Sequence, residues 1–164
     1  MSRSLRIAAM CGTLAVIAAV GPAAAQDGKA TAEATYQDIN QTLGLVPGFF
    51  REFPQSGIAG AWAEFKGVQL NPNSKLSGKM KELIGLAVAA QIPCQYCVYF
   101  HTAAAKANGA TDDEIREAVA MAAIVRHWST VLHGVQVDPA GFKSEVDTVL
   151  RLAGEKAKAA SKSQ

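Results

Sequence analysis

The stretch from Pro93 to His101 constrains this chain most, because it combines two cysteines and a histidine at helical spacings. Cys94 and Cys97 are three residues apart, and His101 lies four residues beyond the second cysteine. On an α-helix, at about 100° per residue, these three positions fall within roughly 60° of one another. Pro93 suits the entrance of a helix, because its missing N–H needs no partner there. The pattern predicts a helix that begins near Cys94 and carries both sulfurs and the imidazole on one side.

This placement favours thiol chemistry. The unpaired N–H groups and the dipole at the start of a helix stabilise an anion, and therefore a thiolate. A histidine one turn further on can take or hold the thiol proton. The arrangement is typical of a thiol that attacks a disulfide or a peroxide.

The same residues allow two plainer interpretations, a structural disulfide and a zinc site. A structural zinc ion needs four ligands, so a site here would have to recruit His127 and His133. Those two histidines are six residues apart and would point about 120° away from each other on one helix. We therefore predict redox cysteines, no metal and no cofactor.

Residues 1–25 have the pattern of a secretory signal peptide. Arg3 and Arg6 form a short basic start, residues 7–20 are apolar, and residues 23–25 fit a small-residue cleavage site. The apolar run is too short to span a bilayer comfortably, although an uncleaved anchor is the alternative. We predict cleavage after Ala25 and a periplasmic or secreted location.

Cleavage would leave a nearly neutral chain. It would remove Arg3 and Arg6 from the 16 basic residues, so that 14 remain against 14 acidic residues. Such a surface gives no electrostatic reason to bind nucleic acid or, after cleavage, an anionic membrane. Cys94 and Cys97 would be the remaining cysteines and would rest as a disulfide in an oxidising compartment. A loop this short stabilises a fold little, which favours a redox role.

The apolar residues recur at helical spacing, and no stretch shows useful strand alternation. We predict an all-α fold of about six or seven helices. Residues 26–43 would hold a flexible leader and a first helix starting near Thr35. Residues 44–153 would form one domain, and residues 154–164 a flexible tail.

Several local signals within the predicted domain mark helix ends. Ser77 is a candidate N-cap for a helix that is apolar nearly all round, which predicts its burial on several sides. Gly109 suits a left-handed position after the cysteine helix. Thr111 and Glu114 have the spacing of a capping box that begins the next helix.

These residues resemble a known family. Glu82, followed twelve positions later by Cys94, then by Cys97 and His101, and further on by Gly109, is similar to the AhpD-like branch of the carboxymuconolactone decarboxylase family. The resemblance covers roughly residues 44–152, and its specific part is residues 76–124.

The resemblance implies an all-α fold, assembly into trimers or hexamers, and alkyl hydroperoxidase-like chemistry. In that chemistry Cys97 attacks a peroxide and becomes a sulfenic acid, and Cys94 resolves it to a disulfide. Glu82 and His101 relay the proton. The partners would be a small peroxide or disulfide substrate and a thiol reductant that the sequence does not identify.

Two departures from the family pattern bear on the activity. The best-known alkyl hydroperoxidase D proteins have a histidine before the second cysteine, whereas this chain has Tyr96, and a neutral phenol is a poor base near pH 7. Those proteins also work in the cytoplasm, so an exported relative would need another electron donor.

Alternatives remain open for the predicted proton relay and for the whole chain. Glu82 could be a solvated charge beside Lys79 and Lys81, and His101 could be a half-buried structural histidine. The chain could be a decarboxylase-type lyase using His101 and Glu82 as acid and base, although the true decarboxylases lack the cysteine pair. It could also be a non-catalytic oligomeric module with a structural disulfide.

Overall fold

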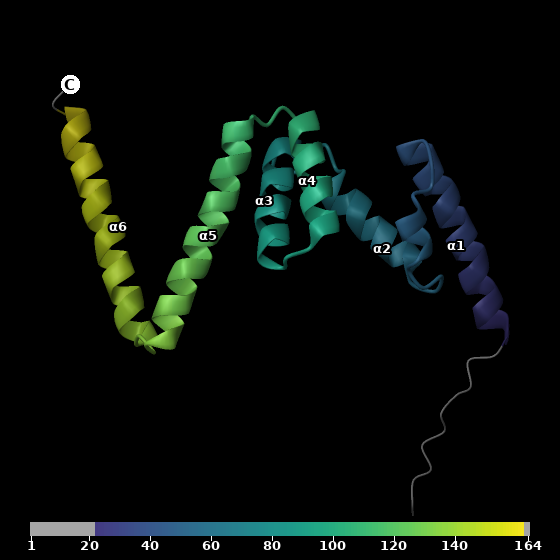
Figure 1. Cartoon of the computed structure of the whole chain (residues 1–164), viewed down its shortest axis with the longest axis horizontal. Helices are drawn as coiled ribbons and strands as arrows, with labels where there is room; N and C mark the ends of the chain where they lie inside the picture. The colour runs from purple at the N-terminus through teal and green to yellow at the C-terminus, as the bar shows by residue number, and fades with distance from the viewer. Residues whose placement is uncertain (1–21, 163–164) are drawn as a thin grey trace, which may run out of the picture. The chain divides into compact units, whose positions relative to one another are not determined.

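The computed structural model describes the backbone of residues 22–162 and the side-chain surroundings of residues 31–162. Within residues 22–162 the chain forms six α-helices and two short helical turns of other types, with no strand (Figure 1). The predicted all-α fold is therefore confirmed. The chain divides into two compact units, one ending at Asn71 and one beginning at Pro72.

The first unit is built from α1, Pro22–Leu43, and α2, Ile58–Glu64. A 3-10 turn, Gly48–Arg51, precedes α2, and a π-helical turn, Phe65–Gln69, continues it. The core of this unit consists of buried apolar and aromatic residues from these elements: Ala32, Tyr36, Ile39, Phe50, Ile58 and Trp62. Phe50 meets the Trp62 ring edge-on at 5.4 Å between centroids, a favourable aromatic geometry.

Helix α1 begins well before the predicted first helix. We expected a flexible leader as far as Ala34 and a helix from about Thr35, whereas α1 already starts at Pro22. Ala32 is 1% exposed and lies four residues before Tyr36 on the same helix face, so part of the expected leader packs into the core. The predicted cleavage point after Ala25 falls within α1, and residues 1–21 of the predicted signal peptide lie outside the described residues.

The second unit consists of four helices: α3, Gly78–Gln91; α4, Gln95–Ala107; α5, Asp112–Gly134; and α6, Pro139–Lys162. Helices α3 and α4 form a hairpin, and both α4 and α5 pack against α3 (Figure 1). No helix within residues 22–162 is long and apolar enough to cross a membrane.

The predicted helix ends of this unit are confirmed. The Ser77 hydroxyl accepts a hydrogen bond from the Met80 N–H at 3.2 Å. Thr111 and Glu114 form the reciprocal capping box at the start of α5. Gly109 adopts a left-handed φ of 82°, where a side chain would be strained.

Two expectations for this unit differ from the structure. Helix α3 is buried mainly on the face that carries Glu82, Leu86 and Ala89, whereas we expected burial on several sides. The opposite side of α3 lines an open groove described below. Helix α6 continues to Lys162 without burying a residue, past the predicted start of the tail at Gly154. Its Ala- and Lys-rich end favours a helix by intrinsic propensity.

Asp38 anchors the polar edge of the first core. Its carboxylate accepts a hydrogen bond from the Trp62 indole at 2.6 Å and from the Lys66 ammonium at 2.8 Å. These bonds, chiefly that of Lys66 and then that of Trp62, hold the pKa of the Asp38 carboxyl below its usual range.

A lowered pKa in the folded state means that Asp38 stabilises the fold above the ordinary aspartate range, and that this contribution is lost as the pH falls through the lowered value. We expect Asp38→Asn to reduce the free energy of unfolding at pH 7 and to flatten its decline between pH 7 and pH 3. Urea unfolding followed by tryptophan fluorescence measures both effects. Asp147→Asn, which removes an exposed carboxylate from α6, is the matched control, and equal pH profiles for the two variants would contradict the expectation.

Candidate active site

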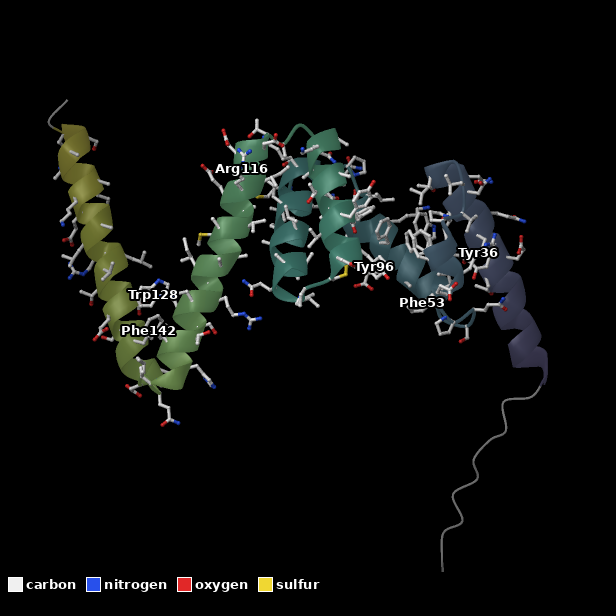
Figure 2. All side chains as sticks on the ribbon, viewed as in Figure 1. Tyr36, Phe53, Tyr96, Arg116, Trp128 and Phe142 are labelled. Atoms are coloured by element: carbon white, nitrogen blue, oxygen red, sulfur yellow. A yellow bond between two sulfur atoms is a disulfide. The ribbon has the colours of Figure 1, made fainter. Side chains whose placement is uncertain are left out.

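The cysteine pair lies at the start of α4. Cys94 is the N-cap residue, and its sulfur accepts a hydrogen bond from the Cys97 N–H at 3.2 Å. Cys94 and Cys97 form a disulfide with their Cα atoms 5.3 Å apart, which is drawn in yellow near the labelled Tyr96 in Figure 2. Both cysteines are half-buried.

The local sequence explains this geometry. Helix α3 ends at Gln91, and a short turn through Ile92 and Pro93 reverses the chain. Cys94 then has extended backbone angles, φ −90° and ψ 99°, as an N-cap residue requires. A sulfur takes the place of the usual N-cap oxygen, so the partial positive charge at the start of α4 acts on Cys94.

Glu82 and His101 come together from two helices. Glu82 lies on the buried face of α3, and its Oε2 lies 2.7 Å from Nδ1 of His101 on α4. The side chains are 6% and 20% exposed, so the pair is shielded from most of the solvent. The structure thus brings together the two residues that the sequence proposed as a proton relay.

The hydrogen bond has a consequence for the imidazole. An ionised carboxylate can only accept, so opposite an ionised Glu82 the Nδ1 atom of His101 would donate and Nε2 would remain the ring's acceptor. Carboxylate–histidine pairs of this kind fix the orientation and tautomer of the ring. His101 follows Cys97 by one turn, so the two residues lie on the same side of α4.

The other candidate site residues that the sequence singled out are exposed to solvent. Tyr96 and Tyr99 are each 79% exposed, and they border the cysteine pair on α4 without being buried by it. His127 and His133 are exposed on α5. Among residues 22–162, no group of three or more His, Cys, Asp or Glu side chains is close enough to hold a metal ion.

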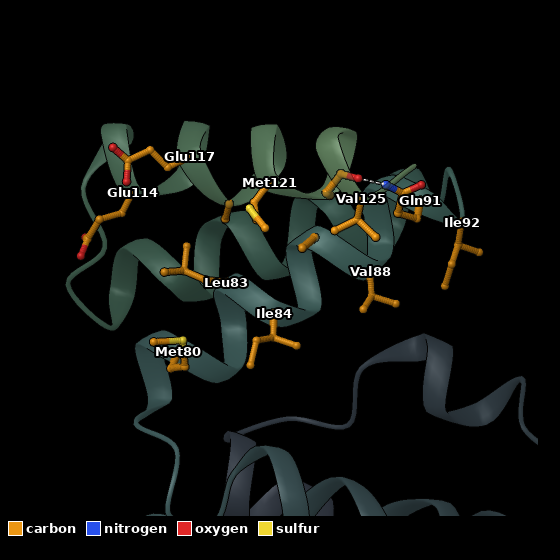
Figure 3. A pocket seen from close by; sticks show the side chains of 13 residues that line it. Met80, Leu83, Ile84, Val88, Gln91, Ile92, Glu114, Glu117, Met121 and Val125 are labelled. Atoms are coloured by element: carbon orange, nitrogen blue, oxygen red, sulfur yellow. Dashed lines mark hydrogen bonds between the residues drawn. The ribbon is translucent and has the colours of Figure 1, made fainter. Parts of the chain in front are cut away.

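Sequence reasoning did not find an apolar groove of about 720 Å³ between α3 and α5 in the second unit (Figure 3). None of Glu82, Cys94, Cys97 or His101 lines it. The lining is mostly aliphatic: Met80, Leu83, Ile84, Ala87, Val88, Ile92, Ala118, Met121, Ala122 and Val125, with Gln91, Glu114 and Glu117 as polar members. The sequence signal that could have predicted this groove is the row of apolar residues on the side of α3 opposite Glu82.

Polar contacts join α3 and α5 at both ends of this groove. Lys79 pairs with Glu114 at 2.6 Å, and this ammonium, followed by the Thr111 N–H, holds the pKa of the Glu114 carboxyl below its usual range. At the other end the Gln91 side chain donates to the Ala122 carbonyl. Polar contacts between α3 and α5 therefore border the apolar groove.

Comparisons with known proteins agree with this fold. The profile of the carboxymuconolactone decarboxylase family matches residues 57–138, half of the chain. The crystal structure of an alkylhydroperoxidase AhpD core from Rhodospirillum rubrum superimposes with a TM-score of 0.59 at 26% identity, over 79% of this chain and 98% of that one. A Paracoccus denitrificans protein, described as uncharacterized protein 4 in the cox locus, is 36% identical over 58 residues, 35% of this chain. The aligned stretch spans 52% of that relative.

The helical fold and the likeness to the AhpD core define an AhpD-like protein of the all-α class. The chain belongs to the carboxymuconolactone decarboxylase family.

The pairing of Glu82 with His101 predicts a tautomer that can be measured. We expect imidazole ¹⁵N shifts of the full-length protein to show a protonated Nδ1 and an unprotonated Nε2 on neutral His101. Glu82→Gln should produce a mixture of tautomers, because an amide offers both a donor and an acceptor. His127 and His133 in the same spectra are internal controls, and a wild-type His101 with the exchanging tautomers of a free histidine would contradict the expectation.

Proposed function

We propose that this chain is an exported thiol–disulfide oxidoreductase with peroxidase activity of the alkyl hydroperoxidase type. The observation that carries the proposal is a Cys-x-x-Cys disulfide at the start of α4, followed one turn later on the same helix by a histidine that pairs with a buried carboxylate. Membership of the carboxymuconolactone decarboxylase family and the likeness to an alkylhydroperoxidase AhpD core support it.

The proposed reaction begins with the reduced pair. His101 takes the Cys97 proton at Nε2, and the Cys97 thiolate attacks one oxygen of the peroxide. The O–O bond breaks, giving a sulfenic acid on Cys97, and the other oxygen leaves as an alcohol after protonation. The Cys94 thiol then attacks the sulfenic sulfur, which releases water and forms the disulfide. An external dithiol supplies the two electrons and two protons that restore the pair.

The hydrogen bond at the N-cap supports the second half of this cycle. A thiolate on Cys94 would keep its bond from the Cys97 N–H, and the start of α4 would stabilise the negative charge. Cys94 is therefore the better leaving group when an incoming thiol opens the disulfide. Attack of the reductant at Cys97 follows from this asymmetry.

The second residue pair supports the proton steps. The Glu82 carboxylate holds the Nδ1–H of His101 and stabilises the imidazolium that forms when Nε2 takes a proton. The exposed Tyr96, which replaces the histidine of the best-known hydroperoxidases, supplies no base. His101 is accordingly the proposed base for the cysteine pair.

Export is part of the proposal and is supported by the sequence of residues 1–25. A basic start, an apolar run and a small-residue cleavage site are the pattern of a secretory signal peptide. A periplasmic or secreted location keeps the pair oxidised at rest, so the reductant must come from an exported dithiol system.

Self-association is also part of the proposal. The groove between α3 and α5 leaves Met121 and Val125 each 58% exposed, and α6 buries no residue. Apolar surface of this extent is typical of a face that another protein covers. A second copy of the chain would bury it, in a trimer or a hexamer as the family resemblance implies.

A decarboxylase-type lyase is the second candidate function. The family profile carries that name, and the Glu82–His101 pair could act as an acid and a base without either cysteine. Such an enzyme would keep its activity on a lactone acid in the Cys94→Ser/Cys97→Ser double variant. An oligomeric module with a structural disulfide would lose only a little melting temperature in the same variant.

We expect wild type to consume cumene hydroperoxide or hydrogen peroxide with dithiothreitol as the reductant. Cys97→Ser should abolish the turnover, and His101→Ala should lower it by about 10²-fold or more, the usual contribution of a general base. His127→Ala, which removes an exposed histidine from α5, should leave the rate unchanged.

Mass spectrometry with a dimedone-type trap identifies the attacking sulfur in the same experiment. In Cys94→Ser the sulfenic acid should accumulate on Cys97, because the resolving thiol is missing. Equal inertness of wild type and Cys97→Ser, with no trapped sulfenic acid, would reject the peroxidase proposal.

Oligomerisation is tested by sedimentation velocity. We expect wild type to sediment as a trimer or a hexamer at micromolar concentration, and Val125→Glu to sediment as a smaller species, because a charge in an apolar interface is costly. Ser129→Glu, on the same helix and outside the groove lining, is the control. Wild type that stays monomeric over a wide concentration range would contradict the proposal, and circular dichroism checks that each variant is helical.

A further inference from the structure

Gly85 lies one turn beyond Glu82 on α3, and the imidazole of His101 occupies the space beside its Cα atom. A Cβ atom built on Gly85 would lie 2.5 Å from Nδ1 and 2.8 Å from Nε2 of His101, and closer still to Cε1. Real Cβ atoms almost never approach another heavy atom within 3.0 Å. The three ring atoms therefore rest directly on the backbone of α3.

Local backbone preferences do not explain a glycine at this position. Gly85 lies in the interior of α3 and is absent from the glycines with positive φ, so its backbone suits any L-residue. A glycine inside a helix destabilises it relative to alanine. A glycine at this position leaves room for the His101 imidazole, which a larger residue would not.

The His101 imidazole lies against Gly85 and is also hydrogen-bonded to Glu82. Nδ1, which lies 2.7 Å from the Glu82 carboxylate, is among the atoms that a methyl group on residue 85 would displace. Any added side chain would push the imidazole away from α3 and lengthen that bond. On the buried face of α3, Glu82 thus offers His101 a hydrogen-bond acceptor, and Gly85 one turn further on leaves room for its ring.

We propose that Gly85 is a positioning residue, whose missing side chain lets the His101 imidazole lie against α3 in hydrogen-bonding contact with Glu82. For its effect on the reaction rate the inference rests on the function proposed above. The inference about the geometry of His101 does not depend on the proposed function. Gly85 touches no reacting atom and acts only through the histidine.

Gly78, another glycine of α3 that faces a close side chain, shows the contrast. A Cβ atom on Gly78 would meet the Asn108 side chain, which caps the end of α4 and has no place in the predicted chemistry. Gly154 in the interior of α6 has nothing within 4 Å of the position that an added methyl group would take. Gly154→Ala is therefore the matched control, because it has the same helix preference and no steric consequence.

The test is a double-mutant cycle on the full-length protein. Gly85→Ala should lower peroxide turnover by about tenfold or more, because it impairs the general base, whereas Gly154→Ala should not lower it. In the His101→Ala background Gly85→Ala should change the residual rate by less than about twofold, since the group through which it acts is gone. An equal fall in both backgrounds would overturn the proposal and assign Gly85 to helix packing alone.

A second readout does not depend on turnover. Imidazole ¹⁵N shifts of Gly85→Ala should show His101 losing the fixed tautomer of wild type, while the shifts of His127 and His133 stay unchanged. Retention of the wild-type His101 signals would overturn the proposal. If wild type is inert towards peroxides, the proposed function fails and these spectra still decide the role of Gly85.

Discussion

The hydrogen bond between Glu82 and His101 is the interaction on which the arrangement of the second unit depends. Taking a carboxylate out of water costs several kcal/mol, so Glu82 can remain on the buried face of α3 only with polar partners that offset this cost. His101 supplies one at 2.7 Å, and it does so across the contact between α3 and α4. The bond therefore links α3 to α4 through two side chains that are largely shielded from solvent.

The cysteine pair is a local feature by comparison. Cys94 caps α4 with its sulfur, and Cys97 lies within the first turn, so the disulfide and its hydrogen bond involve four consecutive residues. Little else in the chain is needed to form it. The rest of the unit orients His101, one turn further along α4, through its hydrogen bond to Glu82 of α3. The proposed redox chemistry combines a locally determined sulfur pair with a base that only helix packing can orient.

Much of the apolar surface of the second unit is left uncovered by its own chain. Helix α3 has apolar residues on two sides, and α4 covers only one of them. The other side opens onto the groove with α5, and α6 has an apolar stripe that includes Phe142 and Val149 but buries neither. Val88 and Met121 are thus apolar and exposed within this chain, and the proposed assembly would cover them.

The sequence by itself determined the helical class, the caps at Ser77 and Thr111, and the placement of Cys94 at a helix start, because each depends on residues within one or two turns. The start of α1 and the end of α6 were missed, since packing of Ala32 and summed propensity decide them. Only the tertiary structure decided that Glu82 meets His101, that Gly85 leaves room for the ring, and that the groove opens opposite them. These are contacts between helices, and the rotation of one helix against another depends on all the side chains at their interface rather than on any local pattern.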